Sequence, residues 1–302
     1  MERYLLELAG TVRQAILDTR GTLKNRQVNG YSPGGDAQFD VDEVAEEAVW
    51  RFLQERGEPI ALYSEDGGLR RIGEPEYVLI VDPIDGTRPA AAGLEMACIS
   101  IAAARFKEDA RIEDVRFALL MEIKSGAYMY ADRAREGLVS HGYRTPVPRL
   151  SGTTSVARMF WSLEFNGHPA RLMTEAYGHL IDLSANTGGV FVFNSASYSL
   201  SRIVTGQLDA YVDIGNRLLK DRPELRADFE RVGKGHVLHL FPYDIAASVL
   251  IAEKAGVVIT DAYGRSLGRT LLMDLSAENQ QSCIAACTRE LHTLLLESIR
   301  WS

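Results

Sequence analysis

The spacing of apolar residues changes along this chain, and that change constrains the fold more than any other feature of the sequence. Apolar residues recur at helical spacing over residues 4–19 and 42–54, which predicts two amphipathic helices. Short apolar runs then predict five strands, at 60–63, 77–81, 97–104, 117–122 and 126–131. Between the two helices, the Gly, Pro and Asn content of residues 29–38 predicts a loop.

Beyond about residue 150, strand-like and helical segments alternate to the end of the sequence. The predicted strands cover 188–193, 208–214, 257–260 and 282–287, and the predicted helices cover about 195–206, 244–255 and 288–300. Such alternation is typical of layered α/β architecture. We therefore expect an α+β lobe over residues 1–150 and an α/β lobe over residues 151–302, with the functional site at their shared interface.

Charge and composition narrow the classes of partner. The formal net charge of -8 argues against nucleic acid, whereas a small phosphorylated substrate can be neutralised locally by metal ions. No stretch approaches the roughly 20 apolar residues of a membrane span, so we expect no membrane partner. The three sparse cysteines form no disulfide framework and favour the cytoplasm. The pair Cys283 and Cys287 lies in an apolar run, which favours core packing over metal binding.

The segment YVLIVDPIDGT, residues 77–87, carries the strongest chemical signal. An apolar strand ends at Asp82, Pro83 stiffens the chain, and a turn follows at Asp85. Two carboxylates three residues apart at a strand's end can converge on one point, and the Ile84 carbonyl can be turned to the same place. Carboxylate and carbonyl oxygens are hard ligands that suit Mg²⁺. A plain turn is the alternative for any Asp-x-x-Asp-Gly sequence, so the rest of the chain decides between the two interpretations.

The residues that follow this pair suit an anion. Gly86 permits close approach of a phosphate to backbone N–H groups, and Thr87 offers a hydroxyl. Pro89 stands where a first helical turn can begin, and a helix N-terminus favours anions.

Other carboxylates also stand at the end of a predicted strand or at the start of a predicted helix. Glu65 and Asp66 end another short apolar strand, and Asp244 begins an apolar helix. Asp244 can be the N-cap of that helix, a metal ligand, or both. Together these residues favour a carboxylate site over a plain turn.

Several ordered motifs resemble the inositol monophosphatase family, which belongs to the lithium-sensitive, metal-dependent sugar phosphatases. The motifs are DPIDGT at 82–87, YSED at 63–66 and YDIAASVLIAEKAG at 243–256, with similar segments at 32–47 and 194–215. The similarity runs from about residue 5 to the C-terminus and is greatest to the archaeal type, which acts on both inositol phosphate and fructose 1,6-bisphosphate. The resemblance implies the αβαβα layered sandwich of the sugar phosphatase fold and a homodimer.

The resemblance also implies roles for individual residues. The metal ligands, for two or three Mg²⁺ ions per site, are Glu65, Asp82, Ile84 through its carbonyl, Asp85 and Asp244. The catalytic residues that position and deprotonate the attacking water are Asp42, Glu65 and Thr87. The substrate contacts are Asp85, Gly86 and Thr87 on the phosphate side, and Ser195, Ala196 and Asp213 on the sugar or polyol side. Metal-activated water needs no protein nucleophile.

The chain departs from the family pattern at several positions. Asp66 stands where a second glutamate is usual, and its shorter side chain is expected to lie behind the ligands. Arg88 follows the first motif in place of the usual Thr or Phe, and it either touches a substrate phosphate or lies on the surface. A basic residue that often precedes the pocket strand is absent, which weakens the case for a bisphosphate. Residues 215–242 are unusually long, and they form either a surface helix with paired charges or a lid that lends a cation to the substrate.

We therefore expect a Mg²⁺-dependent phosphatase acting on a small polyol or sugar monophosphate, above all inositol 1-phosphate. Fructose-1,6-bisphosphatase and 3'-phosphonucleotide phosphatase are the enzymatic alternatives, and a non-catalytic regulatory binding protein is the alternative from another class. His236 and His239 have HxxH spacing but no matching third ligand, so we expect an ordinary structural or surface role for them.

Overall fold

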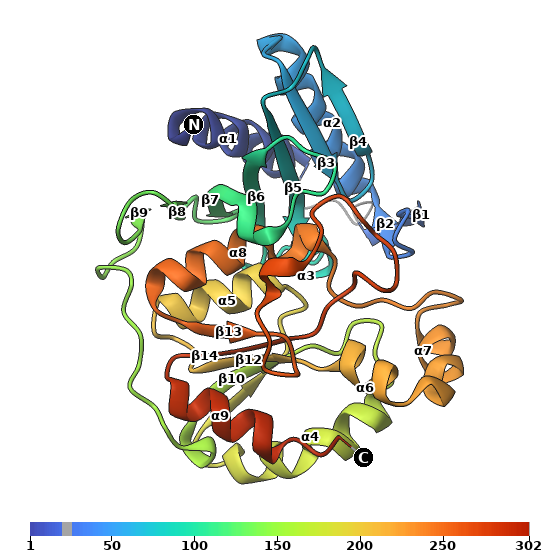
Figure 1. Ribbon diagram of the computed structural model, residues 1–302, viewed down its shortest axis with the longest axis vertical. Coiled ribbons are helices and arrows are strands. Elements are labelled where there is room, and N and C mark those ends of the chain that lie inside the picture. Colours follow the sequence, from blue (N-terminus) through green and yellow to red (C-terminus); the bar gives the residue numbers. More distant parts are fainter. Residues whose placement is uncertain (20–25, 302) are drawn as a thin grey trace.

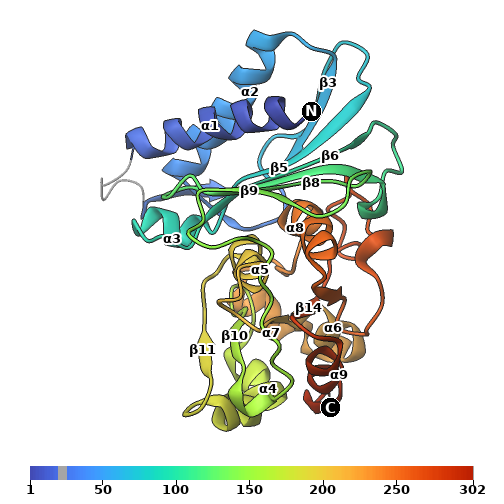
Figure 2. The same ribbon diagram turned by 90° about the vertical axis from the view of Figure 1, so that its left-hand side faces the viewer.

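Two mixed β-sheets and three layers of helices make up the computed structural model, which describes residues 1–19 and 26–301 (Figures 1 and 2). The larger sheet has seven strands in the order β4-β3-β5-β6-β7-β8-β9. Among the described residues of this sheet, β3 and β5 are the only neighbouring strands that pair in parallel, and the other neighbours pair antiparallel. The strands are β3 (Ile60–Ser64), β4 (Gly68–Ile72), β5 (Tyr77–Asp85), β6 (Cys98–Arg105), β7 (Val115–Glu122), β8 (Tyr128–Asp132) and β9 (Val139–His141).

The smaller sheet has five strands in the order β11-β10-β12-β14-β13. Strand β10 pairs in parallel with β11 and β12, and β14 pairs antiparallel with β12 and β13. The strands are β10 (Phe160–Leu163), β11 (Gly189–Phe191), β12 (Ala210–Asp213), β13 (Val258–Thr260) and β14 (Cys283–Ala286).

The first outer layer consists of α1 (Glu2–Thr19) and α2 (Asp40–Arg56), which cover one face of the larger sheet. In α1 the residues buried against the sheet are Leu5, Leu8, Val12 and Ile16, at the spacing of one helical face. Gly57 ends α2 in the left-handed conformation, with φ of 63°. The two helices predicted from apolar periodicity are therefore confirmed.

The middle layer consists of α5 (Ala196–Val204) and α8 (Pro242–Ala255), which lie between the two sheets (Figure 1). Helix α8 contacts β5 to β8 on one side and β13 on the other, and α5 contacts β5 to β7 and β12. A helix buried from both sides is apolar all round, as α8 is from Ile245 to Ala252 except at Ser248, whose hydroxyl donates to Ser197 Oγ. Pro242 opens α8 and Gly256, with φ of 85°, closes it.

The second outer layer consists of α4 (Ala170–Ser184) and α9 (Arg289–Ser298), on the far face of the smaller sheet (Figure 1). The short helices α6 (Gly215–Asp221) and α7 (Arg226–Val232) follow β12 at the side of the molecule. The order of layers confirms the expected αβαβα sandwich. The predicted boundary near residue 150 falls between the two sheets, and the division into two lobes stays a prediction.

Some predictions of local structure need correction. Residues 29–38 are not only a loop, because β1 (Val28–Tyr31) and β2 (Ala37–Phe39) pair antiparallel there. No element was predicted for the segments that contain strands β4, β9 and β10 and helix α4. All three cysteines are buried, and the burial of Cys283 and Cys287 agrees with their predicted packing in the core. No helix in the described part of the chain is long and apolar enough to cross a membrane.

Candidate active site

A polar pocket with a cavity of about 90 Å³ opens where the two sheets and the middle helices meet. Its wall includes the C-terminal end of β5, the start of α5 and the first turn of α8. Of the residues predicted for the site, those in the wall are Glu65, Asp82, Ile84, Asp85, Gly86, Thr87, Arg88, Ser195, Ala196, Asp213 and Asp244. The structure thus brings together residues that are up to 179 positions apart in the sequence, from Glu65 to Asp244.

A β-bulge explains how Asp82 and Asp85 reach the same pocket. Asp82 pairs with Ser100 of β6 and Asp85 pairs with Cys98, so β5 contains one residue more than its partner over this stretch. Successive side chains of a regular strand point to opposite faces, and two residues three apart would face opposite ways. The extra residue turns Asp85 to the side of Asp82. The strand therefore continues to Asp85 and does not end at Asp82 as predicted.

Backbone N–H groups hold these two carboxylates in place. The N–H of Ile84 donates to Asp82 Oδ1 at 2.9 Å, and the N–H of Ser197 donates to Asp85 Oδ2. The Ser195 hydroxyl donates to the backbone carbonyl of Asp85 at 3.2 Å. The loop after β5 is therefore fixed to the start of α5.

Asp244 stands in the first turn of α8, where it lines the pocket and also accepts the N–H of Phe241 at 2.6 Å. It is the third residue of the helix, not the N-cap that the sequence suggested as one possibility. A carboxylate at this position satisfies an orphan donor at the helix N-terminus. Capping and lining the pocket are compatible roles for this side chain.

Asp42 and Asp66 lie behind the pocket wall. The Asp42 carboxylate accepts the N–H of Phe39 at 2.9 Å and hydrogen-bonds the hydroxyl of Thr87, which also donates to the Ile84 carbonyl at 3.2 Å. Asp66 is hydrogen-bonded by Gln38. The Thr87 side chain therefore connects Asp42 to the pocket wall.

Burial and crowding raise the pKa values of the pocket carboxylates. Burial raises the pKa of Asp82, and the nearby charges of Asp85 and Asp244 raise it further. Burial likewise raises the pKa of Glu65, with Asp82 adding to the effect, and the pKa of Asp244, with Asp85 adding to it. Burial raises the pKa of Asp85 too, although hydrogen bonds from Ser197 oppose this. Backbone donors thus offset only part of the cost of ionising these groups.

The donor set fits a divalent cation that prefers oxygen ligands. Four carboxylates, of Glu65, Asp82, Asp85 and Asp244, and the Ile84 carbonyl line one small pocket. Cations are the groups that would neutralise so many buried acids. Within the described ranges, no group of three or more His, Cys, Asp or Glu side chains is already arranged to hold a metal ion.

The pocket wall also contains the residues predicted to face the substrate. Ser195 caps α5 by accepting the N–H of Tyr198 at 3.1 Å, and Ala196 follows it. Asp213, at the end of β12, accepts the N–H of Gly215 at 3.2 Å. Burial raises the pKa of Asp213 to about 7.

The structure adds pocket residues that the sequence did not predict. His239 and His168 lie in contact, with Nδ1 of His239 3.3 Å from Nε2 of His168, which is itself 3.8 Å from Asp213 Oδ1. Burial lowers the pKa of both imidazoles, which favours their neutral forms. Nε2 of His239 is buried without a hydrogen-bond partner in the described chain. Glu164, whose pKa burial raises to about 7, completes this group.

Arg88 lines the pocket and is not a free surface side chain. It forms an ion pair with Asp36, with 2.8 Å between Nη2 and Oδ1. The Asn-Gly turn after β10 places Asn166 in the same wall, 3.4 Å from Asp36. Asp36 and Asn166 lie in loops, where no periodic spacing of apolar residues marks them in the sequence.

The charges of residues 215–242 mostly pair with one another, as expected for a surface helix. Arg217 pairs with Asp221, and Arg226 pairs with Glu230, each at i, i+4 spacing. Lys220 donates to the carbonyl oxygens of Glu278 and Gln280 instead of facing the pocket. The end of this segment, residues 238–241, does line the pocket.

The raised pKa of Asp213 predicts a pH-dependent stability. Its folded pKa of about 7 lies above the ordinary aspartate value of 3.8, so the native state keeps a proton that the unfolded chain releases, and stability falls as pH rises between about 4 and 7. Asp213→Asn removes the free-energy cost of burying this carboxyl with a raised pKa. We expect it to raise the unfolding free energy of the metal-free protein at pH 8 by on the order of 2 kcal/mol, and by less at pH 5.

Urea titrations at the two pH values measure the difference. Asp209→Asn is the matched control, because the buried Asp209 carboxylate accepts the Phe160 N–H at 2.7 Å and a hydroxyl from Ser151. That substitution should destabilise the protein. If Asp213→Asn raised the unfolding free energy equally at pH 5 and pH 8, the raised pKa of Asp213 would be contradicted.

Similarity to known proteins agrees with this geometry. The model of the inositol monophosphatase family matches residues 1–301. The chain is 28% identical over 298 residues to a fructose-1,6-bisphosphatase/inositol-1-monophosphatase of Archaeoglobus fulgidus, covering 99% of this chain and 97% of that one. It is 24% identical to the protein of the same description from Thermococcus kodakarensis, covering 98% and 95%.

Solved structures share the fold. A Pyrococcus horikoshii protein with similarities to inositol-1 monophosphatase superposes with a TM-score of 0.69 at 22% identity, covering 99% of this chain and 98% of that one. The extragenic suppressor protein SuhB of Bartonella henselae superposes with a TM-score of 0.70 at 18% identity, covering 98% and 97%. The match of the family model along almost the whole length shows that this chain belongs to the inositol monophosphatase family.

Proposed function

We propose that this phosphatase hydrolyses the phosphate monoester of a small polyol or sugar, with inositol 1-phosphate as the preferred substrate and Mg²⁺ as the cofactor. Membership of the family makes the chain a metal-dependent phosphoric monoester hydrolase, so the non-catalytic alternative is set aside. One observation carries the proposal: the carboxylates of Glu65, Asp82, Asp85 and Asp244 line a single small pocket together with Ile84.

The metal ligands in this proposal are Glu65, Asp82, Asp85, Asp244 and the Ile84 carbonyl. A bound divalent ion lowers the pKa of water and neutralises phosphoryl oxygens. The backbone donors at Ile84, Ser197 and Phe241 each occupy one side of a carboxylate and so limit its rotation. The protein thereby restricts the directions from which an ion can be held.

Asp42 and Thr87 handle the proton of the attacking water. The Thr87 hydroxyl lies between the Asp42 carboxylate and the Ile84 carbonyl. Burial raises the pKa of Asp42 to about 7. A carboxylate with a pKa near the working pH is an effective acceptor, so Asp42 takes the proton through the Thr87 hydroxyl.

The phosphate rests on the backbone N–H groups of Gly86 and Thr87. Gly86 has φ of 94°, and a Cβ there would lie 2.7 Å from the Met96 carbonyl oxygen and 2.9 Å from Ser195 Cβ. Only glycine allows the chain to turn in this space. Gly86 and Thr87 both line the pocket, so their N–H groups are the proposed phosphate contacts, with Ser195 and Ala196 beside them.

The hydroxyl-bearing part of the substrate faces Asp213 and the histidine pair. Asp213 and Glu164 offer acceptors, and the unpartnered Nε2 of His239 offers a further polar contact. Hydroxyl groups of a polyol can satisfy these buried polar atoms, whereas an apolar ester would leave them unpaired. A small polyol or sugar therefore suits this wall.

Fructose 1,6-bisphosphate is the second candidate substrate. The Archaeoglobus fulgidus and Thermococcus kodakarensis relatives carry this activity in their names, and Arg88 supplies a cation in the pocket wall. However, Asp36 already engages Arg88 through two contacts, at 2.8 and 3.4 Å. We infer that Arg88 holds the wall together and does not bind a second phosphate.

We also propose a homodimer in the cytoplasm. The edge strand β11 exposes Phe191 and Val192, and Phe160 stacks on Phe191 in the same region. An exposed apolar edge of this kind supports a contact with a second copy of the chain. Three buried, unpaired cysteines support a reducing compartment.

The first test concerns the metal and Asp85. Release of phosphate from inositol 1-phosphate should stop in excess chelator, return with Mg²⁺ and be inhibited by Ca²⁺, which prefers larger and looser coordination. Asp85→Asn keeps the size of the side chain and should lower kcat by more than the roughly 10- to 100-fold that loss of an outer partner of a metal site costs.

Asp182→Asn, on the exposed surface of α4, is the control and should have the wild-type rate. Circular dichroism checks that each variant is folded. Full activity in excess chelator, or a wild-type rate for Asp85→Asn, would refute the site.

The second test separates the two substrates. Wild-type kcat/KM should be higher for inositol 1-phosphate than for fructose 1,6-bisphosphate. Arg88→Met removes the cation, and because Asp36 holds it in the wall we expect KM to change by a similar factor for both substrates. A rise in KM confined to the bisphosphate would show that Arg88 binds a second phosphate and would favour the bisphosphatase.

A further inference from the structure

A second cavity, of about 640 Å³, lies at the other end of α5 from the catalytic pocket. Residues of the β7–β8 turn, of the segment 142–151 and of the end of α5 line it, and none of them lines the catalytic pocket. Its volume falls within the roughly 300–1,000 Å³ that small-molecule sites occupy. The proposed phosphatase chemistry does not use this cavity.

The lining of this cavity is basic although the whole chain is acidic. Arg144, Arg149 and Arg202 line it together with a single acidic residue, Glu122, which leaves a local charge of +2 (three cations minus one anion). Among the residues that the structure describes, no carboxylate forms an ion pair with Arg144 or Arg149, and both are exposed to solvent. Arginine guanidinium groups with open donors are well suited to bind phosphate or carboxylate oxygens.

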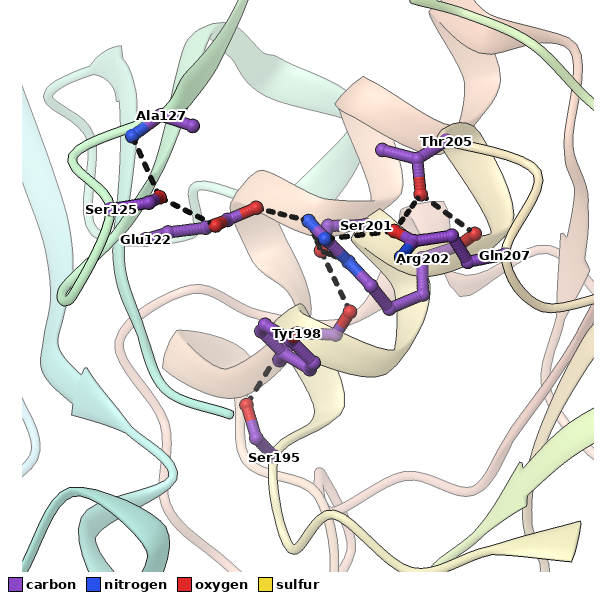
Figure 3. Close-up of polar contacts among 9 residues, drawn as sticks. All are labelled: Glu122, Ser125, Ala127, Ser195, Tyr198, Ser201, Arg202, Thr205 and Gln207. Atoms are coloured by element: carbon purple, nitrogen blue, oxygen red, sulfur yellow. Dashed lines mark hydrogen bonds and ion pairs between the residues drawn. The ribbon is translucent and has the colours of Figure 1, made fainter. Parts of the chain in front are cut away.

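Arg202 is buried and held in a fixed orientation, as Figure 3 shows. Its side chain is 8% exposed, forms an ion pair with Glu122, and donates to Gln207 Oε1 at 3.0 Å. The ring of Tyr198 lies 4.6 Å from the guanidinium carbon, and the ring of Tyr143 lies 5.8 Å from it. An arginine held in this way loses little conformational freedom when it binds a ligand.

The partners of Arg202 are themselves fixed. The Ser125 hydroxyl donates to Glu122 Oε2 at 2.6 Å, and the Thr205 hydroxyl donates to Gln207 Oε1 at 2.8 Å (Figure 3). Close packing of residue 149 on the end of α5 adds to this order, because a Cβ at Gly206 would lie 2.2 Å from the Arg149 carbonyl oxygen. Arg202 and the backbone at Arg149 are therefore held in place, whereas the guanidinium groups of Arg144 and Arg149 are open to a ligand.

Helix α5 connects the two cavities directly. Its N-terminal residues Ser195 and Ser197 hydrogen-bond Asp85 in the catalytic pocket, and Arg202 lies about 10 Å further along the same helix, near its C-terminus. A ligand bound beside Arg202 lies at one end of a short helix whose other end hydrogen-bonds Asp85. Helix α5 is therefore the element through which the two cavities can be coupled.

We propose that this second cavity binds a small phosphorylated metabolite, and that α5 transmits this binding to the catalytic pocket. The phosphate is bound by Arg144 and Arg149 with Arg202 behind them, and the hydroxyls of Ser151 and Thr205 face the polar body of the ligand. The overall charge of -8 disfavours long polyanions, so the local basic wall selects a small one.

The probe for the test is the phosphonate analogue of glucose 6-phosphate, in which carbon replaces the ester oxygen so that the enzyme cannot hydrolyse it. Binding is measured by calorimetry with metal-free protein, so that no bound cation can hold the phosphonate in the catalytic pocket. We expect saturable binding to the wild-type protein. Citrate serves as the comparison for a carboxylate ligand of similar charge.

The double variant Arg144→Ala/Arg149→Ala should weaken binding of the phosphonate by about ten-fold or more. The control Arg158→Ala/Arg289→Ala removes the same charge from exposed positions outside both cavities and should bind within two-fold of wild type. Equal affinity of the two double variants, or no binding to wild type at millimolar phosphonate, would overturn the site. Binding of citrate without binding of the phosphonate would overturn the ligand class.

The coupling has its own measurement, in the holoenzyme with Mg²⁺ and p-nitrophenyl phosphate as the reporter substrate. The phosphonate should change kcat of the wild type, and this effect should be lost in Arg144→Ala/Arg149→Ala. An effect on KM alone that persists in that double variant would show competition at the catalytic pocket and would overturn the coupling through α5.

Discussion

The repulsion among buried carboxylates at the junction of the two sheets is the constraint around which the rest of this molecule is arranged. Asp82 and Asp85 are buried, Asp244 is half-buried in the same pocket, and each raises the pKa of a neighbouring carboxyl. Backbone N–H groups at the starts of α5 and α8 and within the β5 bulge offset part of that cost. In the proposed function, a bound divalent cation offsets the remainder of that cost.

The middle helices make this arrangement possible. Helices α5 and α8 are covered by a sheet on each side, so their N-terminal turns are fixed by packing on both faces. The two cavities lie at opposite ends of α5, and the ion pair between Arg202 and Glu122 ties its far end to the larger sheet. The same burial that holds the catalytic acids thus provides a rigid connection to a second site.

Much of the fold and of the site could be predicted from the sequence, and the features that could not be predicted were missed for physical reasons. The acids of β5 and the start of α8 were recognisable because each lies in a short contiguous motif with a clear strand or helix beside it. His168 and His239 were not, because their contact depends on tertiary packing of segments 71 residues apart. Helix α4 was missed although Leu172, Met173, Ala176 and Leu180 recur at helical spacing, a signal that was available. The bulge in β5 could not be read from the sequence, since it is defined by pairing with β6.

The central claim is that protonated, buried carboxylates exchange their protons for a metal ion. Calorimetric titration of the metal-free protein with Mg²⁺ at pH 6, in buffers with different ionisation enthalpies, counts the protons released on binding. Because burial raises the pKa values of Glu65, Asp82 and Asp244, we predict net proton release at pH 6 that declines as pH rises. Mg²⁺ binding without proton release, and with the same affinity at pH 6 and pH 9, would contradict this account.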